Sequence, residues 1–267
     1  MDTARALIAG DEGLLAMVES NPPCNERFAA LGIPQTEAAR RAYRQLLVTT
    51  PGLGEAISGA ILYDETIREA TSDGASFVEV LVKAGIIPGI KVDLGAKALA
   101  GHLGEEVTEG LDGLRERLAE YSAMGVRFAK WRAVIAIVGD RIPSRGRIEA
   151  NAHALAPYAA LCQEAELVPI VEPEVLMDGD HDLARCCEVT EEALRAVLCA
   201  LYTQRVALEG MLLKPNMVLP GMTCATQETV DEVADATVRC LLRAVPQPFR
   251  GLRSSRVGSP RSWRRPV

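Results

Sequence analysis

Lysine is rare in this chain, and three lysines stand where an amine could do chemistry. Among 267 residues with 29 basic side chains, only five are lysines, and Lys91, Lys130 and Lys214 close short apolar runs. An amine attacks a ketone only in its neutral form, which burial and a nearby cation favour. The run before Lys214 supplies burial and Lys130 could supply the like charge. The sequence therefore predicts imine chemistry at Lys214, with the alternative that this lysine simply reaches solvent from a strand end.

Two carboxylates precede this lysine in the run Val171-Glu-Pro-Glu-Val175. Glu172 and Glu174 share one face of an extended chain, and paired carboxylates suit proton transfer while an imine forms and breaks. A solvated carboxylate pair at the start of a loop is the simpler alternative. A metal site that adds Asp178, Asp180 and His181 is disfavoured because no histidine pair converges there. We expect neither a metal nor a cofactor.

Short apolar runs alternate with amphipathic helical stretches along most of the chain. Such alternation is typical of a parallel sheet wrapped by helices. The six predicted strands lie in residues 13–17, 56–63, 87–93, 127–134, 167–172 and 208–214. The predicted helices span residues 36–49, 111–124, 147–165, 182–203 and 227–244. No G-x-G-x-x-G follows a strand, so the pattern favours an α/β barrel over an open dinucleotide-binding sheet.

Composition and charge exclude several classes of protein. The chain is 48 % hydrophobic and 24 % charged, which suits one large buried core. Its net charge is −7, while residues 250–267 carry six arginines and no acid, so the acidic remainder argues against nucleic acid as the main partner. The first residues lack the pattern of a signal peptide, and no apolar run is long enough to span a membrane. The seven cysteines show no C-x-x-C spacing, and we interpret them as reduced thiols of a cytoplasmic protein. We also expect no membrane partner.

Several segments together resemble one enzyme family, class I fructose-1,6-bisphosphate aldolase, over residues 2–248. They are Arg41-Ala-Tyr-Arg-Gln-Leu-Leu47, Gly59-Ala-Ile-Leu-Tyr-Asp-Glu-Thr66, Gly89-Ile-Lys-Val-Asp93, Gly110-Leu-Asp-Gly-Leu114, Phe128-Ala-Lys-Trp-Arg132, Val168-Pro-Ile-Val-Glu-Pro-Glu174, Asp178-Gly-Asp-His-Asp182 and Leu208-Glu-Gly-Met-Leu-Leu-Lys-Pro-Asn-Met217. The resemblance implies a TIM (β/α)8 barrel that assembles as a homotetramer. It further implies a metal-independent lyase of glycolysis and gluconeogenesis whose small-molecule partner is a sugar phosphate. The enzyme would cleave fructose 1,6-bisphosphate to dihydroxyacetone phosphate and glyceraldehyde 3-phosphate.

The resemblance also assigns roles to individual residues. Lys214 matches the Schiff-base lysine, Glu172 the glutamate that shuttles protons, and Lys130 the lysine that assists at the carbinolamine. The positions expected near the substrate or its phosphates are Lys91, Arg132, Arg27, Arg40 and Glu174.

Two departures from the family pattern bear on activity. Val18 stands where the family has an aspartate close to the Schiff-base lysine, and valine cannot exchange a proton. From Pro246 onward a Pro/Ser/Arg-rich segment replaces two further strands. We therefore expect a partial barrel domain at 1–249 with about six of eight strands, and a disordered basic tail at 250–267. Impaired aldolase activity follows, with a catalytically inactive fragment or pseudoenzyme as the alternative, and the altered end also argues against the tetramer.

Overall fold

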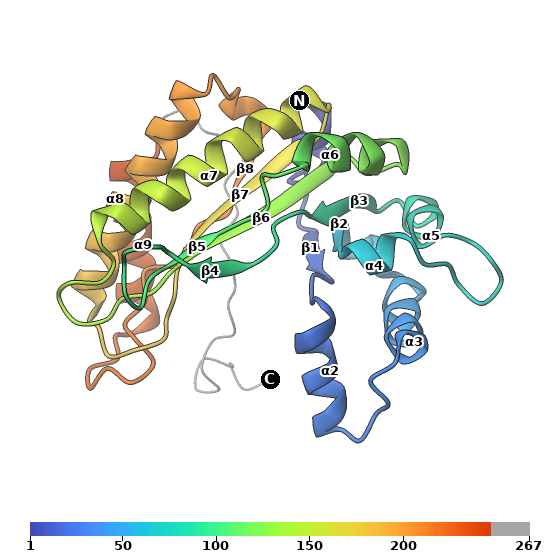
Figure 1. Ribbon diagram of the computed structural model, residues 1–267, viewed down its shortest axis with the longest axis horizontal. Helices are drawn as coiled ribbons and strands as arrows, with labels where there is room; N and C mark the ends of the chain where they lie inside the picture. The colour runs from blue at the N-terminus through green and yellow to red at the C-terminus, as the bar shows by residue number, and fades with distance from the viewer. Residues whose placement is uncertain (247–267) are drawn as a thin grey trace. The chain divides into compact units, whose positions relative to one another are not determined.

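A sheet of six strands organises the protein, as the sequence predicts. The computed structural model describes residues 1–246, and the strand order in this sheet is β1-β2-β3-β6-β7-β8 (Figure 1). The pairs β1–β2, β2–β3, β3–β6 and β7–β8 are parallel. The strands are β1 (Gly13–Ala16), β2 (Ile57–Leu62), β3 (Ile87–Lys91), β6 (Phe128–Ile135), β7 (Val168–Val175) and β8 (Leu212–Leu213). The predicted α/β class is thus confirmed.

Helices connect successive strands of this sheet. The α-helices are α1 (Asp2–Ala6), α2 (Asn21–Ala30), α3 (Glu37–Val48), α4 (Asp64–Ile67), α5 (Phe77–Lys83), α6 (Leu114–Ala123), α7 (Arg145–Glu164), α8 (Leu183–Thr203) and α9 (Val230–Ala244). Two 3-10 turns, η1 (Leu53–Glu55) and η2 (Leu208–Gly210), precede β2 and β8. Parallel neighbours require such crossover connections, because a tight hairpin can join only antiparallel strands.

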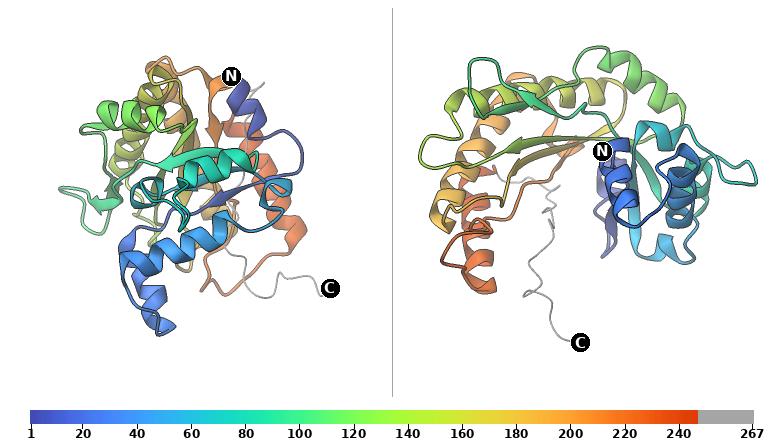
Figure 2. Two further views of the ribbon diagram at one scale, coloured as in Figure 1. Left: turned by 90° about the vertical axis from the view of Figure 1, so that its right-hand side faces the viewer. Right: turned by 60° about the horizontal axis from the view of Figure 1, so that its bottom comes forward.

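The chain forms two compact units. Unit 1 comprises Met1–Val92, Asp112–Trp131 and Leu161–Pro169, and unit 2 comprises Asp93–Leu111, Arg132–Ala160 and the residues from Ile170 onward. In unit 1 helix α5 packs on β3 and against α3. In unit 2 helices α8 and α9 lie side by side (Figures 1 and 2). Each unit has its own buried apolar residues, among them Phe77, Leu81 and Ile90 in unit 1 and Val171, Leu201 and Leu213 in unit 2.

Local sequence explains why these elements form. All eight residues of β7 are buried, and its Val/Ile-rich composition suits a strand covered on both faces. Asp182 caps α8 by accepting the backbone N–H of Arg185 at 2.7 Å. Thr229 and Glu232 form a capping box at the start of α9. Each cap satisfies backbone donors that the first helical turn leaves unpaired.

A glycine permits close packing between β3 and β6 in unit 1. Gly89 pairs with Phe128 across these strands. A Cβ at Gly89 would collide with the Phe128 ring. Because that ring is fully buried, it cannot move aside into solvent. Because Gly89 has no side chain, β3 can pair closely with β6. This pairing keeps Lys91, at the end of β3, opposite Lys130 of β6.

Some elements differ from those that periodicity indicates. Helix α2 begins at Asn21 after its N-cap Ser20, and Pro22 and Pro23 follow in its first turn. Proline is tolerated there because the first helical N–H groups have no partner in the helix. The antiparallel pair β4 (Ala96–Ala98) and β5 (Glu106–Thr108) was not predicted either. Both segments are too short or too polar to give a clear apolar period.

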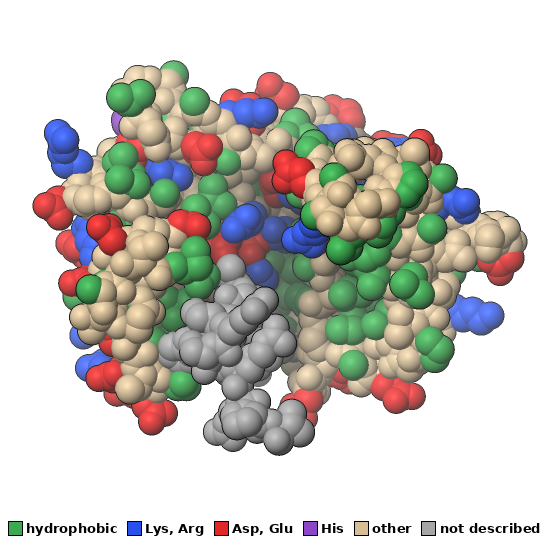
Figure 3. Space-filling model, turned by 90° about the horizontal axis from the view of Figure 1, so that it is seen from below, with side chains coloured by type: hydrophobic (Ala, Val, Ile, Leu, Met, Phe, Trp, Pro, Cys, Tyr) green, Lys and Arg blue, Asp and Glu red, His purple; other side chains and the backbone are tan. Residues whose placement is uncertain are grey.

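Within residues 1–246 no helix is long and apolar enough to cross a membrane. On the face shown in Figure 3, acidic and basic side chains are interspersed around the edge. The predicted disordered tail at 250–267 lies outside the described residues. The partial barrel domain at 1–249 stays a prediction.

Candidate functional site

Lys214 and Glu172 are in direct contact in unit 2. Strand β8 pairs with β7 through Ile170–Leu212 and Val171–Leu213, and the Lys214 backbone N–H donates to the Val171 carbonyl at 2.9 Å. This register sets Lys214 beside Glu172, and its Nζ forms an ion pair with Glu172 Oε1. The Glu172 side chain is 3 % exposed and the Lys214 side chain 23 %. The sequence predicts both residues at strand ends; Lys214 directly follows β8, whereas Glu172 lies inside β7. The structure brings their functional groups together.

The buried amide of Asn216 fixes the segment that follows Lys214. Its Oδ1 accepts the backbone N–H of Val175 at 3.0 Å, and its Nδ2 donates to Thr190 Oγ1 at 3.0 Å and to the Met217 carbonyl at 2.9 Å. Proline at position 215 has no N–H to continue the strand ladder. The side chain of Asn216 therefore takes over the cross-link between the two segments that carry Glu172 and Lys214. Sequence reasoning missed this residue, although it belongs to the quoted Lys-Pro-Asn-Met run.

Glu174 belongs to a second charged group in unit 2. Arg132 Nε donates to Glu174 Oε2, and the Arg132 backbone N–H donates to Asp93 Oδ2 at 3.3 Å. Glu174 and Asp93 are buried, whereas the Arg132 side chain is 40 % exposed. Glu172 and Glu174 thus bind different cations. Asp93 was not predicted, yet its position two residues after Lys91 could have indicated it.

A small cavity adjoins this second group. Its volume is about 70 Å³, and its lining includes Arg132, Glu174, Met177, Asn216 and Leu219. It is large enough for a few atoms of a ligand or for ordered water. Among the residues that the structure describes, no three His, Cys, Asp or Glu side chains lie as metal ligands would.

Unit 1 holds the two other predicted lysines. Lys91 and Lys130 are directly opposite each other in the β3–β6 pair, and the Val92 backbone N–H donates to the Lys130 carbonyl at 3.1 Å. Lys130 is 5 % exposed. Two cations on neighbouring parallel strands raise the local positive potential, an environment that suits an anionic substrate group.

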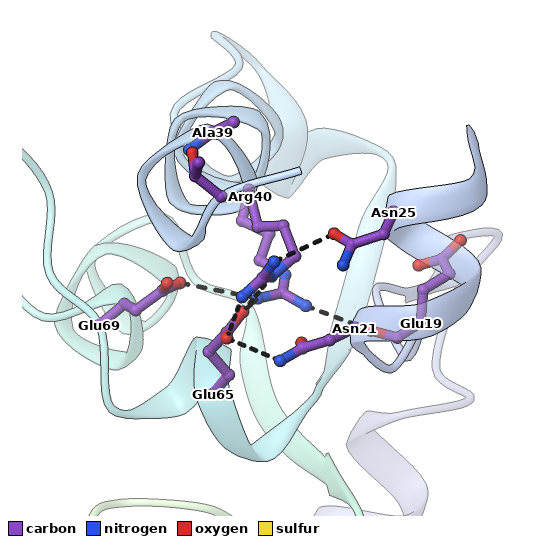
Figure 4. A network of polar contacts seen from close by, with 9 residues as sticks. Glu19, Asn21, Asn25, Ala39, Arg40, Glu65 and Glu69 are labelled. Atoms are coloured by element: carbon purple, nitrogen blue, oxygen red, sulfur yellow. Dashed lines mark hydrogen bonds and ion pairs between the residues drawn. The ribbon is translucent and has the colours of Figure 1, made fainter. Parts of the chain in front are cut away.

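Arg27 and Arg40 also lie in unit 1, in different environments. Arg27 is 68 % exposed and pairs with Glu19 at 2.7 Å. Arg40 is buried, and its guanidinium donates to both oxygens of Glu65 at 2.8 and 2.7 Å and to Asn25 Oδ1 at 3.0 Å (Figure 4). Three of its donors are therefore engaged within the protein. A role for Arg40 in phosphate binding stays a prediction.

Arg44 and Glu69 extend the network around Arg40, and sequence reasoning missed both. Arg44 Nη1 lies 2.5 Å from Glu65 Oε1 and 3.9 Å from Glu69 Oε2. A hydrogen bond from Arg40, together with Arg44, lowers the pKa of Glu65 to about 2. Burial raises the pKa of Glu69 to about 7 despite the attraction of Arg44. Arginines four residues apart on α3 share a helix face, which is the signal that could have found this network.

Val18 lies two residues beyond the end of β1 and is half-buried. Its side chain offers neither a proton nor a hydrogen bond. The neighbouring Glu19 has a carboxylate, but that group is bound to Arg27.

Parallel strands with connecting helices, and a lysine–glutamate pair toward the carboxyl ends of two adjacent strands, define an enzyme of the (β/α)-barrel class. The family model described as "Glycolytic: Fructose-bisphosphate aldolase class-I" matches residues 1–254. The chain belongs to the class I fructose-bisphosphate aldolase family, a family of glycolytic lyases.

Individual relatives agree with this assignment. The chain is 59 % identical over 251 residues to a probable fructose-bisphosphate aldolase class 1 of Xanthomonas campestris pv. campestris, a match that covers 94 % of this chain and 75 % of the relative. It is 47 % identical to fructose-bisphosphate aldolase 3, chloroplastic, of Arabidopsis thaliana, with 94 % of this chain and 63 % of the relative covered. A solved structure of fructose-bisphosphate aldolase from Plasmodium falciparum superposes with a TM-score of 0.92 at 44 % identity. That match covers 95 % of this chain and 73 % of the other.

Proposed function

We propose that this chain cleaves fructose 1,6-bisphosphate to dihydroxyacetone phosphate and glyceraldehyde 3-phosphate through a Schiff base on Lys214, with low turnover. The observation that carries the proposal is the contact between Lys214 Nζ and Glu172 Oε1. A lysine amine next to a buried carboxylate has a partner for each proton that imine formation moves.

The reaction would begin when the neutral amine of Lys214 attacks the ketone carbon of the sugar. Glu172 would give a proton to the carbinolamine oxygen, which leaves as water, and Lys130 would assist at this step. The protonated imine then accepts the electron pair of the breaking C3–C4 bond and releases the aldehyde. Protonation of the resulting enamine and hydrolysis of the imine return dihydroxyacetone phosphate and free Lys214. The imine itself is the electron sink, so this cycle uses no metal.

The remaining predicted residues would bind the substrate. Lys91 and Arg132 would neutralise phosphate or orient hydroxyl groups, and Arg27, which is exposed, would meet a phosphate at the surface. Glu174 would hold Arg132 in place through their ion pair. Arg40 would act less directly, because three of its donors already bind Glu65 and Asn25.

Low turnover is proposed because of Val18. Cleavage of the C3–C4 bond requires a base for the C4 hydroxyl proton, and the aldolase pattern has an aspartate at this position. Loss of a general base typically slows a reaction by about 10²–10⁴-fold. Imine formation does not need this group and would survive. The second candidate, a catalytically inactive relative, rests on the same residue.

Reductive trapping separates these candidates. The chain is incubated with dihydroxyacetone phosphate and sodium borohydride, and peptide mapping locates the reduced adduct. We expect the adduct on Lys214 and none in Lys214→Arg, together with slow but measurable cleavage of fructose 1,6-bisphosphate. Trapping without any cleavage would favour the inactive relative. Absence of a Lys214 adduct would refute the Schiff-base proposal itself.

The proposal includes a cellular setting and an assembly. We place the activity in the cytoplasm, with support from the seven cysteines, all of which are free thiols. Sugar phosphates would be its small-molecule partners, without nucleic acid or membrane. Sedimentation of the purified chain would test whether it forms the homotetramer that the family resemblance implies.

A further inference from the structure

Three cysteines of unit 2 meet where α8 packs against α9. Cys186 and Cys187 are neighbours in α8, and Cys240 lies in α9. These helices run side by side (Figures 1 and 2). None of the three thiols has a role in the proposed aldol reaction.

Cys240 approaches Cys187 across this contact. Cys240 Sγ lies 3.8 Å from the Cys187 carbonyl oxygen. Burial, followed by the charge of Cys187 and a hydrogen bond with its side chain, raises the pKa of Cys240 to about 12. The Cys240 thiol therefore lies against residue 187 of the neighbouring helix.

Cys186 points to a different set of partners. Its Sγ accepts the backbone N–H of Leu219 at 3.4 Å and lies 3.9 Å from Thr190 Oγ1. Successive residues of an α-helix are turned by about 100° from each other. The vicinal cysteines thus serve different neighbours, and Cys187 is the one directed to α9.

Solvent reaches the two facing thiols unequally. Cys187 is half-buried and lines two surface hollows of unit 2, of about 1010 and 430 Å³. Cys240 has no exposed surface. A small oxidant can therefore approach Cys187 directly, whereas Cys240 can react only with its neighbour.

We propose that Cys187 and Cys240 form an oxidant-responsive dithiol site whose substrate is a small hydroperoxide. Hydrogen peroxide oxidises the Cys187 thiol to a sulfenic acid and is itself reduced to water. The Cys240 sulfur then attacks the Cys187 sulfur and displaces a second molecule of water. The product is a disulfide between α8 and α9, and one peroxide has removed two electrons and two protons from the pair.

The cross-link would fasten the helix that supports the Lys214 segment. It joins residues 53 apart in sequence and restrains α8, in which Thr190 accepts the Asn216 amide. Closing a loop of this length restricts the unfolded chain. The site does not depend on the proposed aldol chemistry, because it uses none of the same side chains.

Peptide mapping of the peroxide-treated protein tests the site. The full chain is exposed to hydrogen peroxide, free thiols are blocked with N-ethylmaleimide, and the digest is analysed with and without dithiothreitol. We expect a peptide pair that links Cys187 to Cys240 and separates on reduction. A Cys186–Cys187 disulfide, or sulfinic acid at Cys187 with Cys240 still alkylated, would overturn the proposal. So would the absence of any oxidation product at Cys187.

Variants assign the order of the two steps. In Cys240→Ala the sulfenic acid at Cys187 has no resolving partner, so we expect a dimedone adduct there that accumulates at least tenfold over wild type. Cys187→Ser should abolish the cross-link. Cys199→Ser is the matched control, because Cys199 is an exposed cysteine of the same helix and should leave the cross-link unchanged. If Cys240→Ala does not fold, the wild-type map and Cys187→Ser still decide.

Discussion

The side chain of Asn216 accepts the backbone N–H of Val175 at 3.0 Å and so continues, past a proline, the strand pairing that sets Lys214 beside Glu172. Strand β8 has only two residues, so little else along the backbone holds the lysine in position. An active amine on so short a strand depends on a side-chain cross-link two residues away.

Replacing Asn216 should therefore weaken both stability and imine chemistry. Asn216→Ala leaves the buried N–H of Val175 without its acceptor, which costs about 1–3 kcal/mol. We expect the rate of borohydride trapping at Lys214 to fall at least tenfold under conditions where the variant is still folded. Chemical denaturation and trapping rates measure the two effects separately.

Asn151 provides the matched control for this experiment. It is also buried in unit 2, accepts the Thr108 backbone N–H at 3.1 Å, and donates to the carbonyls of Glu106 and Arg147. Asn151→Ala should cost similar stability without slowing the trapping reaction. Equal losses of trapping in both variants would show that Asn216 acts only through general stability.

Glu172→Gln tests the proton-transfer role at nearly constant shape. The amide cannot exchange the proton that a carboxylate can, so we expect trapping at Lys214 to slow by about 10²–10⁴-fold. Rapid-quench sampling of the borohydride-reduced adduct measures this rate. A variant that traps as fast as wild type would remove Glu172 from the mechanism.

Val18→Asp should restore cleavage without changing trapping. An aspartate supplies the base for the C4 hydroxyl, so cleavage of fructose 1,6-bisphosphate should rise by up to about 10²–10⁴-fold. A coupled assay that follows glyceraldehyde 3-phosphate gives the rate. Val18→Asn has the same shape as aspartate but no titratable group, and gains of similar size in both variants would argue against proton transfer.

Glu69→Gln should stabilise unit 1 at neutral and alkaline pH. The folded-state pKa of Glu69 is about 7, above the ordinary value of 4.5, so the folded state binds more protons than the unfolded state between these pH values. Stability therefore falls as pH rises from about 4.5 to about 7 and is level above that range. Glutamine removes this loss, of order 3 kcal/mol. Denaturation at pH 5 and pH 8 should show the variant gaining only at pH 8.

Glu65→Gln should act in the opposite direction. The pKa of Glu65 is lowered to about 2, so its stabilising contribution is present above pH 4.5 and is lost as pH falls toward 2. The variant should be less stable than wild type at pH 8, because Arg40 and Arg44 lose the charge of a half-buried carboxylate. A gain in stability at pH 8 in this variant would contradict the network shown in Figure 4.

The sequence predicted the strand positions well, because buried parallel strands leave apolar runs that are easy to see. It also predicted that Lys214 lies at a strand end. Glu172 was expected to end its strand, but it lies inside β7, which continues to Val175. It could not predict the partners of the polar groups, such as Asn216 with Val175 or Arg132 with Asp93. Those contacts join residues about forty positions apart, and periodicity carries no information on such pairs. Helix α2 was missed for a different reason, since two prolines usually indicate a break and here occupy its first turn.

The contact between Gly89 and Phe128 limits how this protein can evolve. A larger residue at Gly89 collides with a fully buried ring, so any first substitution there is selected against. A smaller residue at Phe128 would have to come first, at the cost of a cavity. Each change is harmful alone and tolerable only with the other, so the two positions should vary together among descendants of this chain. The segment that carries Lys91 and Lys130 is thereby protected from drift by packing as well as by chemistry.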